Sequence, residues 1–203
     1  IKRLIDIVVA AAGLLLLSPV LVLAALLVRI NLGAPVLFRQ MRPGKDQIIF
    51  PIYKFRTMRD ATDASGKPLS DGERLTGFGK WLRATSIDEL PELWNILKGD
   101  MSLIGPRPLL PDYLPYYSEH QIVRHRMRPG LTGLAQVRGR NLLSWDDRLD
   151  LDVEYIRHWS LWLDFKIALM TVGVVMARRG INAAGEATMT RFDDYVRSRQ
   201  KVH

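Results

Sequence analysis

The chain has 203 residues, which is enough for one domain with a modest core and an appended segment. It contains no cysteine, which excludes disulfides, thiolate zinc sites and a cysteine nucleophile. Its 29 Lys and Arg residues against 21 Asp and Glu residues give a net charge of +8, which favours an anionic partner such as a nucleotide, a nucleic acid or an anionic lipid surface.

Residues 7–28 form a long apolar run without a charged side chain. A helix of this length reaches roughly 33 Å, enough to cross a bilayer. Ser18 and Pro19 interrupt it near its middle, where a proline removes a hydrogen bond and kinks a helix. Lys2 and Arg3 precede the run and further basic residues follow it, so both ends prefer the cytoplasm. The residues alone leave two readings open: a broken helix that enters and leaves by one leaflet, or a kinked helix that spans the membrane.

Asp6 lies at the edge of this apolar run, close in sequence to Lys2 and Arg3. An ionisable group near lipid is expected to find a partner of opposite charge. We therefore predict that Asp6 pairs with these basic residues and anchors the segment at the membrane interface.

Two short apolar stretches on either side of residues 42–45, Arg-Pro-Gly-Lys, predict a small antiparallel hairpin. Alternation over residues 52–58 places Lys54 and Arg56 on one face of the second strand. Such a face can line an anion site, although a basic strand face is more often only solvated.

Residues 86–100 carry apolar side chains at helical spacing and predict a short helix that ends at Gly99. Ser86 and Glu89 are spaced as a capping box, while Pro91 allows the helix to start with Asp88 as its cap instead. In both cases Asp88 and Glu89 lie at or just before the first turn.

The first N–H groups of a helix are unpaired and can hold a phosphate beside these two carboxylates. Adjacent residues on a helix point about 100° apart, so Asp88 and Glu89 do not form a proton-sharing pair. One can attack while the other holds a cation. From the spacing alone, two simple capping charges are the better-supported interpretation.

Two further segments contain arginines next to prolines or glycines, which restrict or loosen the backbone. In residues 105–108, Gly-Pro-Arg-Pro, the prolines restrict the backbone around Arg107, whose guanidinium suits a phosphate or a carboxylate; a structural ion pair is the alternative. Residues 129–141 contain three glycines, with Arg138 and Arg140 beside the last. This segment is neither a Walker loop nor a dinucleotide fingerprint, but it can form an arginine-bearing phosphate loop.

The remaining part of the chain combines an acidic and an apolar segment. Residues 146–154 carry five acidic side chains, which we interpret as a solvated helix face, with a metal role for Asp152 left open. Residues 161–179 predict an apolar helix whose uncharged part, 167–177, is too short to span a membrane. This helix belongs to the core or lies in the interface plane.

In their order and spacing, these motifs together resemble the monotopic phosphoglycosyl transferases, which are small bacterial sugar transferases. The resemblance covers nearly the whole chain. Its motifs are Lys2-Arg3 with Asp6, the Ser18-Pro19 break, Tyr53-Lys54-Phe55-Arg56-Thr57-Met58, Asp88-Glu89-Leu90-Pro91, Gly105-Pro106-Arg107-Pro108, Pro129-Gly130-Leu131-Thr132-Gly133 and Gly139-Arg140-Asn141. The tail around residues 185–188 is most similar to that of members acting on diacetylated bacillosamine.

The resemblance implies a reaction: a phospho-sugar passes from a UDP-sugar, here UDP-N,N'-diacetylbacillosamine, to undecaprenyl phosphate, and UMP is released. It implies that Asp88 is the nucleophile that forms a covalent phospho-sugar intermediate. It implies that Glu89 binds Mg²⁺, which neutralises the diphosphate. Phosphate oxygens are then expected to contact Arg140, Lys54, Arg83 and Arg107.

The resemblance also implies an architecture, which resolves the two readings of the apolar run. Residues 1–34 are expected to form a re-entrant hairpin broken at Ser18-Pro19, and residues 35–203 a catalytic domain seated on the cytoplasmic face of the bacterial inner membrane. The expected fold is mixed α/β and mostly helical, with a small antiparallel hairpin and amphipathic helices that lie along the surface. The expected partners are the UDP-sugar, undecaprenyl phosphate and membrane lipid; a homo-oligomer is allowed and no nucleic acid is expected.

Two other functions compete with this interpretation. The charge and the basic strand also fit a non-enzymatic, membrane-anchored protein that binds nucleotides or anionic lipid. An enzyme that transfers the sugar without its phosphate would release UDP in place of UMP, so the nucleotide product separates it from a phosphoglycosyl transferase.

Overall fold

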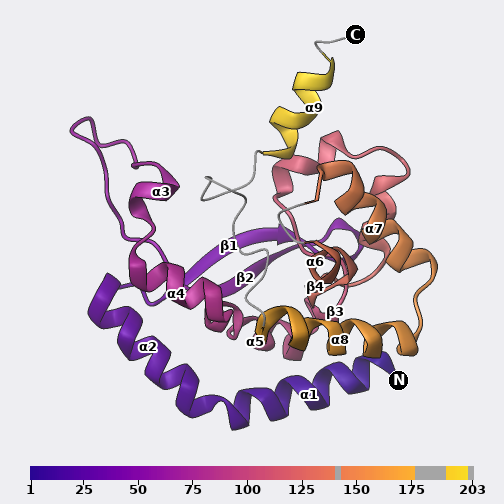
Figure 1. The fold of residues 1–203 in the computed structure, drawn as a ribbon, viewed down its shortest axis with the longest axis horizontal. Helices are drawn as coiled ribbons and strands as arrows, with labels where there is room; N and C mark the ends of the chain where they lie inside the picture. The colour runs from indigo at the N-terminus through magenta and orange to yellow at the C-terminus, as the bar shows by residue number, and fades with distance from the viewer. Residues whose placement is uncertain (140–142, 177–190, 201–203) are drawn as a thin grey trace.

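The computed structural model describes residues 1–139, 143–176 and 191–200. Helices α1 (Lys2–Leu16) and α2 (Ser18–Leu32) form an arc along one side of the molecule, and the rest of the chain lies on its inner side (Figure 1). The fold is mostly helical with one small antiparallel sheet, as predicted. Helix α9 (Phe192–Gln200) lies at the side farthest from α1 and α2 (Figure 1).

Helices α1 and α2 meet at a bend of 62°, at the predicted break. Pro19 lies in the first turn of α2, where its missing N–H removes no helical hydrogen bond. The Ser18 hydroxyl donates to the Leu15 carbonyl oxygen over 2.7 Å and satisfies one carbonyl at the end of α1. Among the described residues no single helix has the length and apolar character to cross a membrane, whereas this bent pair meets both criteria when its two helices are taken together.

The predicted hairpin is confirmed. Strand β1 (Leu37–Pro43) pairs antiparallel with β2 (Ile49–Phe55), with Arg42 opposite Phe50, across a turn that contains the 3-10 helix η1 (Lys45–Gln47). Strand β2 ends three residues before the predicted limit at Met58, and the Arg56 N–H still donates to the Val36 carbonyl oxygen over 2.9 Å. Its guanidinium donates to the Leu32 carbonyl oxygen and pairs with Asp60 at 2.7 Å. Arg56 and Lys54 therefore have different partners, because Lys54 contacts Glu89 and Glu92 instead.

The predicted helix around residues 86–100 begins later than expected. Helix α4 (Gly77–Thr85) ends at Ser86, which has a φ of 56° and donates its N–H to the Arg83 carbonyl oxygen. Ser86 therefore closes α4 and forms no side-chain cap, so the predicted capping box with Glu89 is wrong. A 3-10 helix, η2 (Ile87–Glu89), follows, and α5 (Glu92–Lys98) starts directly after Pro91 and ends at Gly99 as predicted.

A second pair of strands explains two of the glycine motifs. Strands β3 (Ser102–Ile104) and β4 (Gly130–Thr132) pair in parallel. Gly105 and Gly130 let their backbones touch, because a Cβ on Gly130 would lie 2.1 Å from the Gly105 nitrogen. Gly130 and Gly133 therefore serve close packing against the backbone of Gly105. This packing also holds in place the segment that carries Arg107.

In Figure 1, α3 (Asp71–Arg74) lies above α4, and α8 (Leu161–Met176) runs along the inner side of the arc. Four other elements complete this part of the fold. They are η3 (Pro111–Tyr116), η4 (Gln121–Arg126), α6 (Leu134–Arg138) and α7 (Trp145–Arg157). The acidic run lies on α7. Its Asp152 is 2% exposed and pairs with Arg124 at 2.7 Å, so it is neither solvated nor available as a metal ligand.

The polar residues at the start of α1 bind the rest of the fold. Asp6 accepts hydrogen bonds from the Ser102 hydroxyl and the Leu103 N–H, each over 3.0 Å, so its predicted pairing with Lys2 and Arg3 is wrong. Lys2 instead pairs with Asp164 of α8 at 2.6 Å. Arg3 donates to two carbonyl oxygens at the end of α5. These contacts explain the polar N-terminus, since each group faces a different element of the domain.

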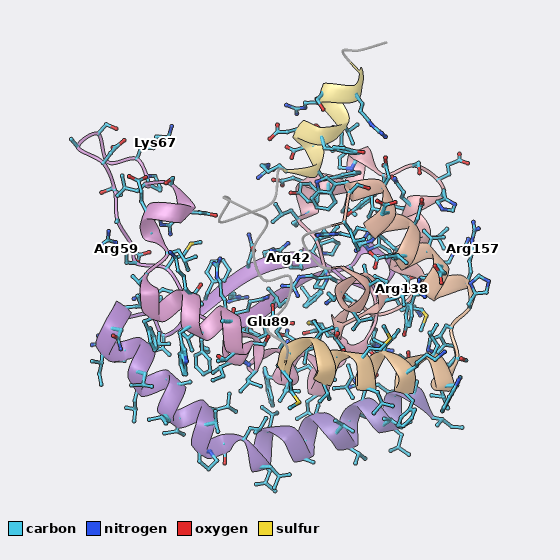
Figure 2. The ribbon with its side chains drawn as sticks, in the orientation of Figure 1. Arg42, Arg59, Lys67, Glu89, Arg138 and Arg157 are labelled. Carbon is cyan, nitrogen blue, oxygen red and sulfur yellow. The ribbon has the colours of Figure 1, made fainter. Side chains whose placement is uncertain are left out.

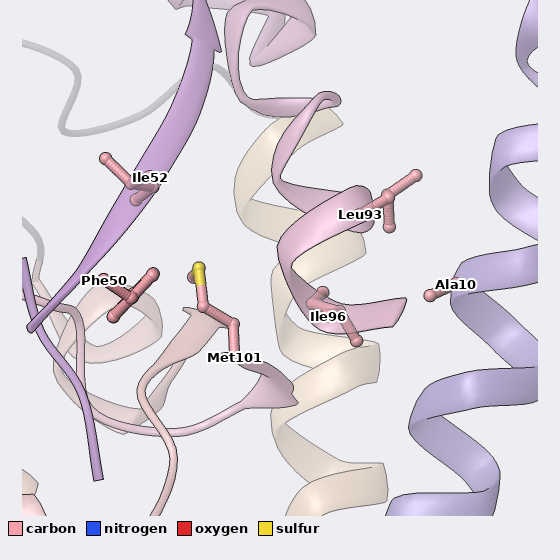
Figure 3. Packing of buried hydrophobic residues seen from close by; sticks show 6 residues of the cluster. All are labelled: Ala10, Phe50, Ile52, Leu93, Ile96 and Met101. Atoms are coloured by element: carbon pink, nitrogen blue, oxygen red, sulfur yellow. The ribbon is translucent and has the colours of Figure 1, made fainter. Parts of the chain in front are cut away.

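The core beneath the site is built around α5. Leu93 and Ile96 of α5 lie between Ala10 of α1 on one side and Met101 and the β2 side chains Phe50 and Ile52 on the other (Figure 3). Ile96 and Met101 are fully buried. Full burial of such a side chain stabilises the fold by about 1.5–3 kcal/mol. The start of α5 is thereby held between the hairpin and the N-terminal helix.

Candidate active site

Asp88 lies in the turn η2, between α4 and α5. Its side chain is enclosed, and the residue is 7% exposed. No group in the described part of the chain donates a hydrogen bond to its carboxylate. A buried carboxylate that is not tied by hydrogen bonds keeps its oxygen lone pairs available for another atom, which is what a nucleophile requires.

Glu89, the next residue, is held by two cations. Its Oε1 accepts from Lys54 Nζ over 2.7 Å and from Arg107 Nη2 over 2.6 Å. Lys54 reaches it from strand β2, and Arg107 from the segment after β3. Lys54 and Arg107 are therefore far apart in the chain but meet at one carboxylate. Both were expected to contact phosphate, and the fold places them close together.

The two neighbouring carboxylates have opposite electrostatic environments. Burial, followed by the charge of Glu89, raises the pKa of Asp88 to about 6. Burial would also raise the pKa of Glu89, but Arg107 and Lys54 outweigh it and hold that pKa well below its usual range. Glu89 is therefore ionised at neutral pH, whereas the pKa of Asp88 lies close to neutral pH. Perturbed carboxylates of this kind are typical of functional sites.

The other predicted phosphate-binding residues are partly brought together. The charge of Arg83 acts on Asp88, and its Nε donates to the Thr57 hydroxyl over 3.1 Å. Arg107 forms the ion pair that was the alternative to phosphate binding, but its target is the site carboxylate Glu89. Arg140 lies outside the described residues.

Two residues that the sequence motifs did not predict for the site also lie here. Glu92, the first residue of α5, is 2% exposed, and its Oε1 is 3.0 Å from Lys54 Nζ. Burial raises the pKa of Glu92 to about 7. Arg42 of β1 donates to the Pro108 carbonyl oxygen over 3.4 Å; Figure 2 labels it near Glu89 in the middle of the molecule. The sequence signal for Glu92 is its spacing: it follows Glu89 by three residues, so both side chains can lie near the same basic residue.

The carboxylates have the chemistry that a Mg²⁺ ion requires. All hydrogen bonds that Glu89 accepts within the described chain fall on Oε1, which leaves Oε2 for a cation. Among the described residues no group of three or more His, Cys, Asp or Glu side chains is placed to hold a metal. Mg²⁺ is usually held by one or two carboxylates together with substrate phosphates and waters, so Glu89 with Asp88 fits it without such a group.

The comparisons with known proteins identify the family of the chain. Residues 1–178 match the family model described as bacterial sugar transferase, and the chain belongs to this family. It is 48% identical over 192 residues to the uncharacterized sugar transferase EpsL of Bacillus subtilis, a match that covers 95% of each chain.

Two relatives with named activities are similar over most of this chain. The UDP-glucose:undecaprenyl-phosphate glucose-1-phosphate transferase of Caulobacter vibrioides is 46% identical, over 84% of this chain and 68% of the relative. The undecaprenyl-phosphate galactose phosphotransferase of Salmonella typhimurium is 36% identical, over 89% of this chain and 41% of the relative. The expected enzyme class, a phosphoglycosyl transferase, is thereby confirmed. The diacetylbacillosamine preference stays a prediction, because these two names specify glucose and galactose.

Proposed function

We propose that this enzyme transfers a phospho-sugar from a UDP-sugar to undecaprenyl phosphate, with UMP and an undecaprenyl diphosphate sugar as products. The observation that carries the proposal is the pair of adjacent carboxylates with different surroundings. Asp88 is buried without a hydrogen-bond donor in the described chain, while Glu89 is bound by Lys54 and Arg107. The activities in the names of the relatives support the same reaction.

The chemistry has two displacements at one phosphorus atom. In the first, an Asp88 carboxylate oxygen forms a bond to the β-phosphorus of the donor. The bond from that phosphorus to the bridging oxygen breaks, and UMP leaves with the electron pair. In the second, an oxygen of undecaprenyl phosphate forms a bond to the same phosphorus. The bond to Asp88 then breaks, which restores the carboxylate and yields the lipid diphosphate.

Each nearby residue has a separate part in these steps. Glu89, with its free Oε2, would hold Mg²⁺, which supplies charge neutralisation of the donor diphosphate when bound. Lys54, Arg83 and Arg107 would contact phosphate oxygens, as would Arg140. Arg107 and Lys54 already have their charged groups within 2.7 Å of a site carboxylate, so a nearby phosphate would find them in place.

The N-terminal hairpin supports a site at a membrane surface. Apolar side chains near the bend are largely exposed, with Leu15 75% and Leu16 76% accessible. Large apolar patches are unfavourable in water and favour a lipid environment. We propose that residues 1–34 enter the cytoplasmic leaflet of the bacterial inner membrane and return, and that residues 35–203 form the catalytic domain on its surface. A soluble donor and a lipid acceptor can then meet at Asp88.

Mass spectrometry of enzyme quenched with donor alone tests the intermediate. The enzyme is incubated separately with UDP-glucose, UDP-galactose and UDP-N,N'-diacetylbacillosamine, without undecaprenyl phosphate. The peptide that contains Asp88 should gain one phospho-sugar with the true donor, and Asp88→Asn should abolish both this adduct and UMP release. Asp46→Asn, in the exposed hairpin turn, is the matched control and should retain both.

The same donors with undecaprenyl phosphate identify the nucleotide product and the sugar. UMP is the expected product, and the donor that releases it fastest identifies the preferred sugar. Release of UDP would instead indicate transfer of the sugar without its phosphate. Turnover without any adduct on the Asp88 peptide would refute covalent catalysis.

A further inference from the structure

Glu92 and Glu89 both form ion pairs with the same ammonium group. Lys54 Nζ lies 2.7 Å from Glu89 Oε1 and 3.0 Å from Glu92 Oε1. Glu92 is 2% exposed, and the Lys54 side chain is 18% exposed. Lys54 donates a hydrogen bond to Glu89, whereas the buried Glu92 Oε1 accepts none within the described chain. An ammonium carries three N–H donors, so Lys54 has one donor for Glu92 and one for a further acceptor.

The other charges around Glu92 come from different elements. Lys54 on β2 and Arg107 after β3 favour its ionised form, while Glu89 on η2 opposes it, and Glu92 in turn acts on Arg42 of β1. Burial is the largest influence and raises the pKa of Glu92 to about 7. A carboxylate this deeply buried is costly unless it is paired, and Lys54 is the cation closest to it in the described chain.

Lys54 has two partners that it does not contact at the same time through the same N–H, a donor phosphate oxygen and Glu89. In the proposed function its ammonium contacts a phosphate oxygen, yet in this structure it is bound to Glu89, which would hold the metal ion. When the Lys54 ammonium turns from Glu89 Oε1 to a phosphate oxygen of the donor, the lysine loses Glu89 as a partner. Its flexible four-carbon stem then has many positions available, and restricting them costs conformational entropy. Glu92, which remains beside Lys54 when the contact with Glu89 is lost, limits the positions that the ammonium can take.

We propose that Glu92 is a positioning residue that keeps the Lys54 ammonium at the site while Lys54 exchanges Glu89 for a phosphate oxygen of the donor. This inference rests on the proposed function. A purely structural role for Glu92 is the alternative, since a glutamate in the first turn of a helix interacts favourably with the helix dipole. The two roles differ in whether the effect of Glu92 depends on Lys54.

A double-mutant cycle separates them. The steady-state kcat and KM for UMP release are measured for full-length enzyme, Glu92→Gln, Lys54→Met and the double variant, with the donor preferred in the panel above. Glu92→Gln should lower kcat/KM by about 10-fold in the presence of Lys54, mainly through KM for the donor, and by less than about 2-fold in the Lys54→Met background. Glu154→Gln, at an exposed position of α7, is the matched control and should change neither constant.

Equal losses in the two backgrounds, or no loss with Lys54 present, would overturn the proposal. Glutamine keeps the size of the side chain, and thermal unfolding of each variant shows whether it folds. A second readout needs no turnover: reductive methylation of Lys54, followed by peptide mass spectrometry, should be several-fold faster in Glu92→Gln than in the unmodified chain. Unchanged labelling would also overturn the proposal. Absence of UMP from every donor with the unmodified chain would reject the proposed function, and the labelling would still decide whether Glu92 holds Lys54.

Discussion

The buried ion pair between Arg124 and Asp152 offers the sharpest test of how the domain holds its site. Both side chains are 2% exposed. Arg124 donates to Asp152 Oδ2 through Nε over 3.1 Å and through Nη2 over 2.7 Å, and its Nη2 also donates to the Arg107 carbonyl oxygen over 2.7 Å. The pair therefore links α7 to the backbone of a residue that contacts Glu89.

Replacing Arg124 by Met should destabilise the protein strongly, because it leaves the Asp152 carboxylate buried without its partner. Removal of one member of such a pair costs about 3–5 kcal/mol. For a chain of this length, each kcal/mol lowers the melting temperature by about 2–4 °C, so a decrease of about 6–20 °C is expected. Burial already raises the pKa of Asp152, and the substitution should raise it further.

The double variant Arg124→Met with Asp152→Leu isolates the cause. It removes the uncompensated charge as well, so it should recover most of the lost stability. Both variants lose the hydrogen bond to the Arg107 carbonyl oxygen, so both should have a lower kcat for UMP release. Unfolding in detergent, followed by circular dichroism, measures the stability. Arg191→Met breaks an exposed pair with Asp112 and should cost about 0–1 kcal/mol. A single variant as stable as the double variant would refute the reasoning.

Two further predictions concern residues that support the site from a distance. His125 is 5% exposed, and burial, followed by the charge of Arg124, lowers its pKa to about 4. Its neutral form is favoured in the fold, so the protein should lose stability as pH falls through the unfolded value of about 6.5 towards 4. Between pH 7 and pH 5 this contribution is ~2 kcal/mol, and it should be absent in His125→Gln when both proteins are unfolded with denaturant at each pH. Gly79→Ala should disturb the site, because a Cβ there would lie 1.8 Å from the Thr57 carbonyl oxygen, and the Thr57 hydroxyl accepts from Arg83. The expected cost is about 1–3 kcal/mol with a lower kcat, whereas Gly77→Ala on the same helix meets no atom within 4 Å and should be close to neutral; equal melting temperatures for the two would contradict this.

Local chemistry in the sequence was sufficient for the features that depend on a few consecutive residues. The Pro19 break, the hairpin around residues 42–45 and the end of α5 at Gly99 follow from backbone freedom and missing N–H groups, which act within one turn. The adjacent Asp88 and Glu89 could also be located, because their position before a short helix is a local property. These parts needed no information about the rest of the fold.

The partners of the charged side chains were decided only by the tertiary structure. Lys54 and Glu89 are 35 residues apart, Arg124 and Asp152 are 28 apart, and Asp6 meets Ser102 over 96 residues. A buried charge can be stabilised by any suitable group that packing brings near it. The prediction that Asp6 pairs with Lys2 and Arg3 relied on sequence proximity and was therefore wrong. Packing of α5 between the hairpin and α1 likewise placed Glu92 beside Lys54, because that burial depends on contacts from three separate segments of the chain.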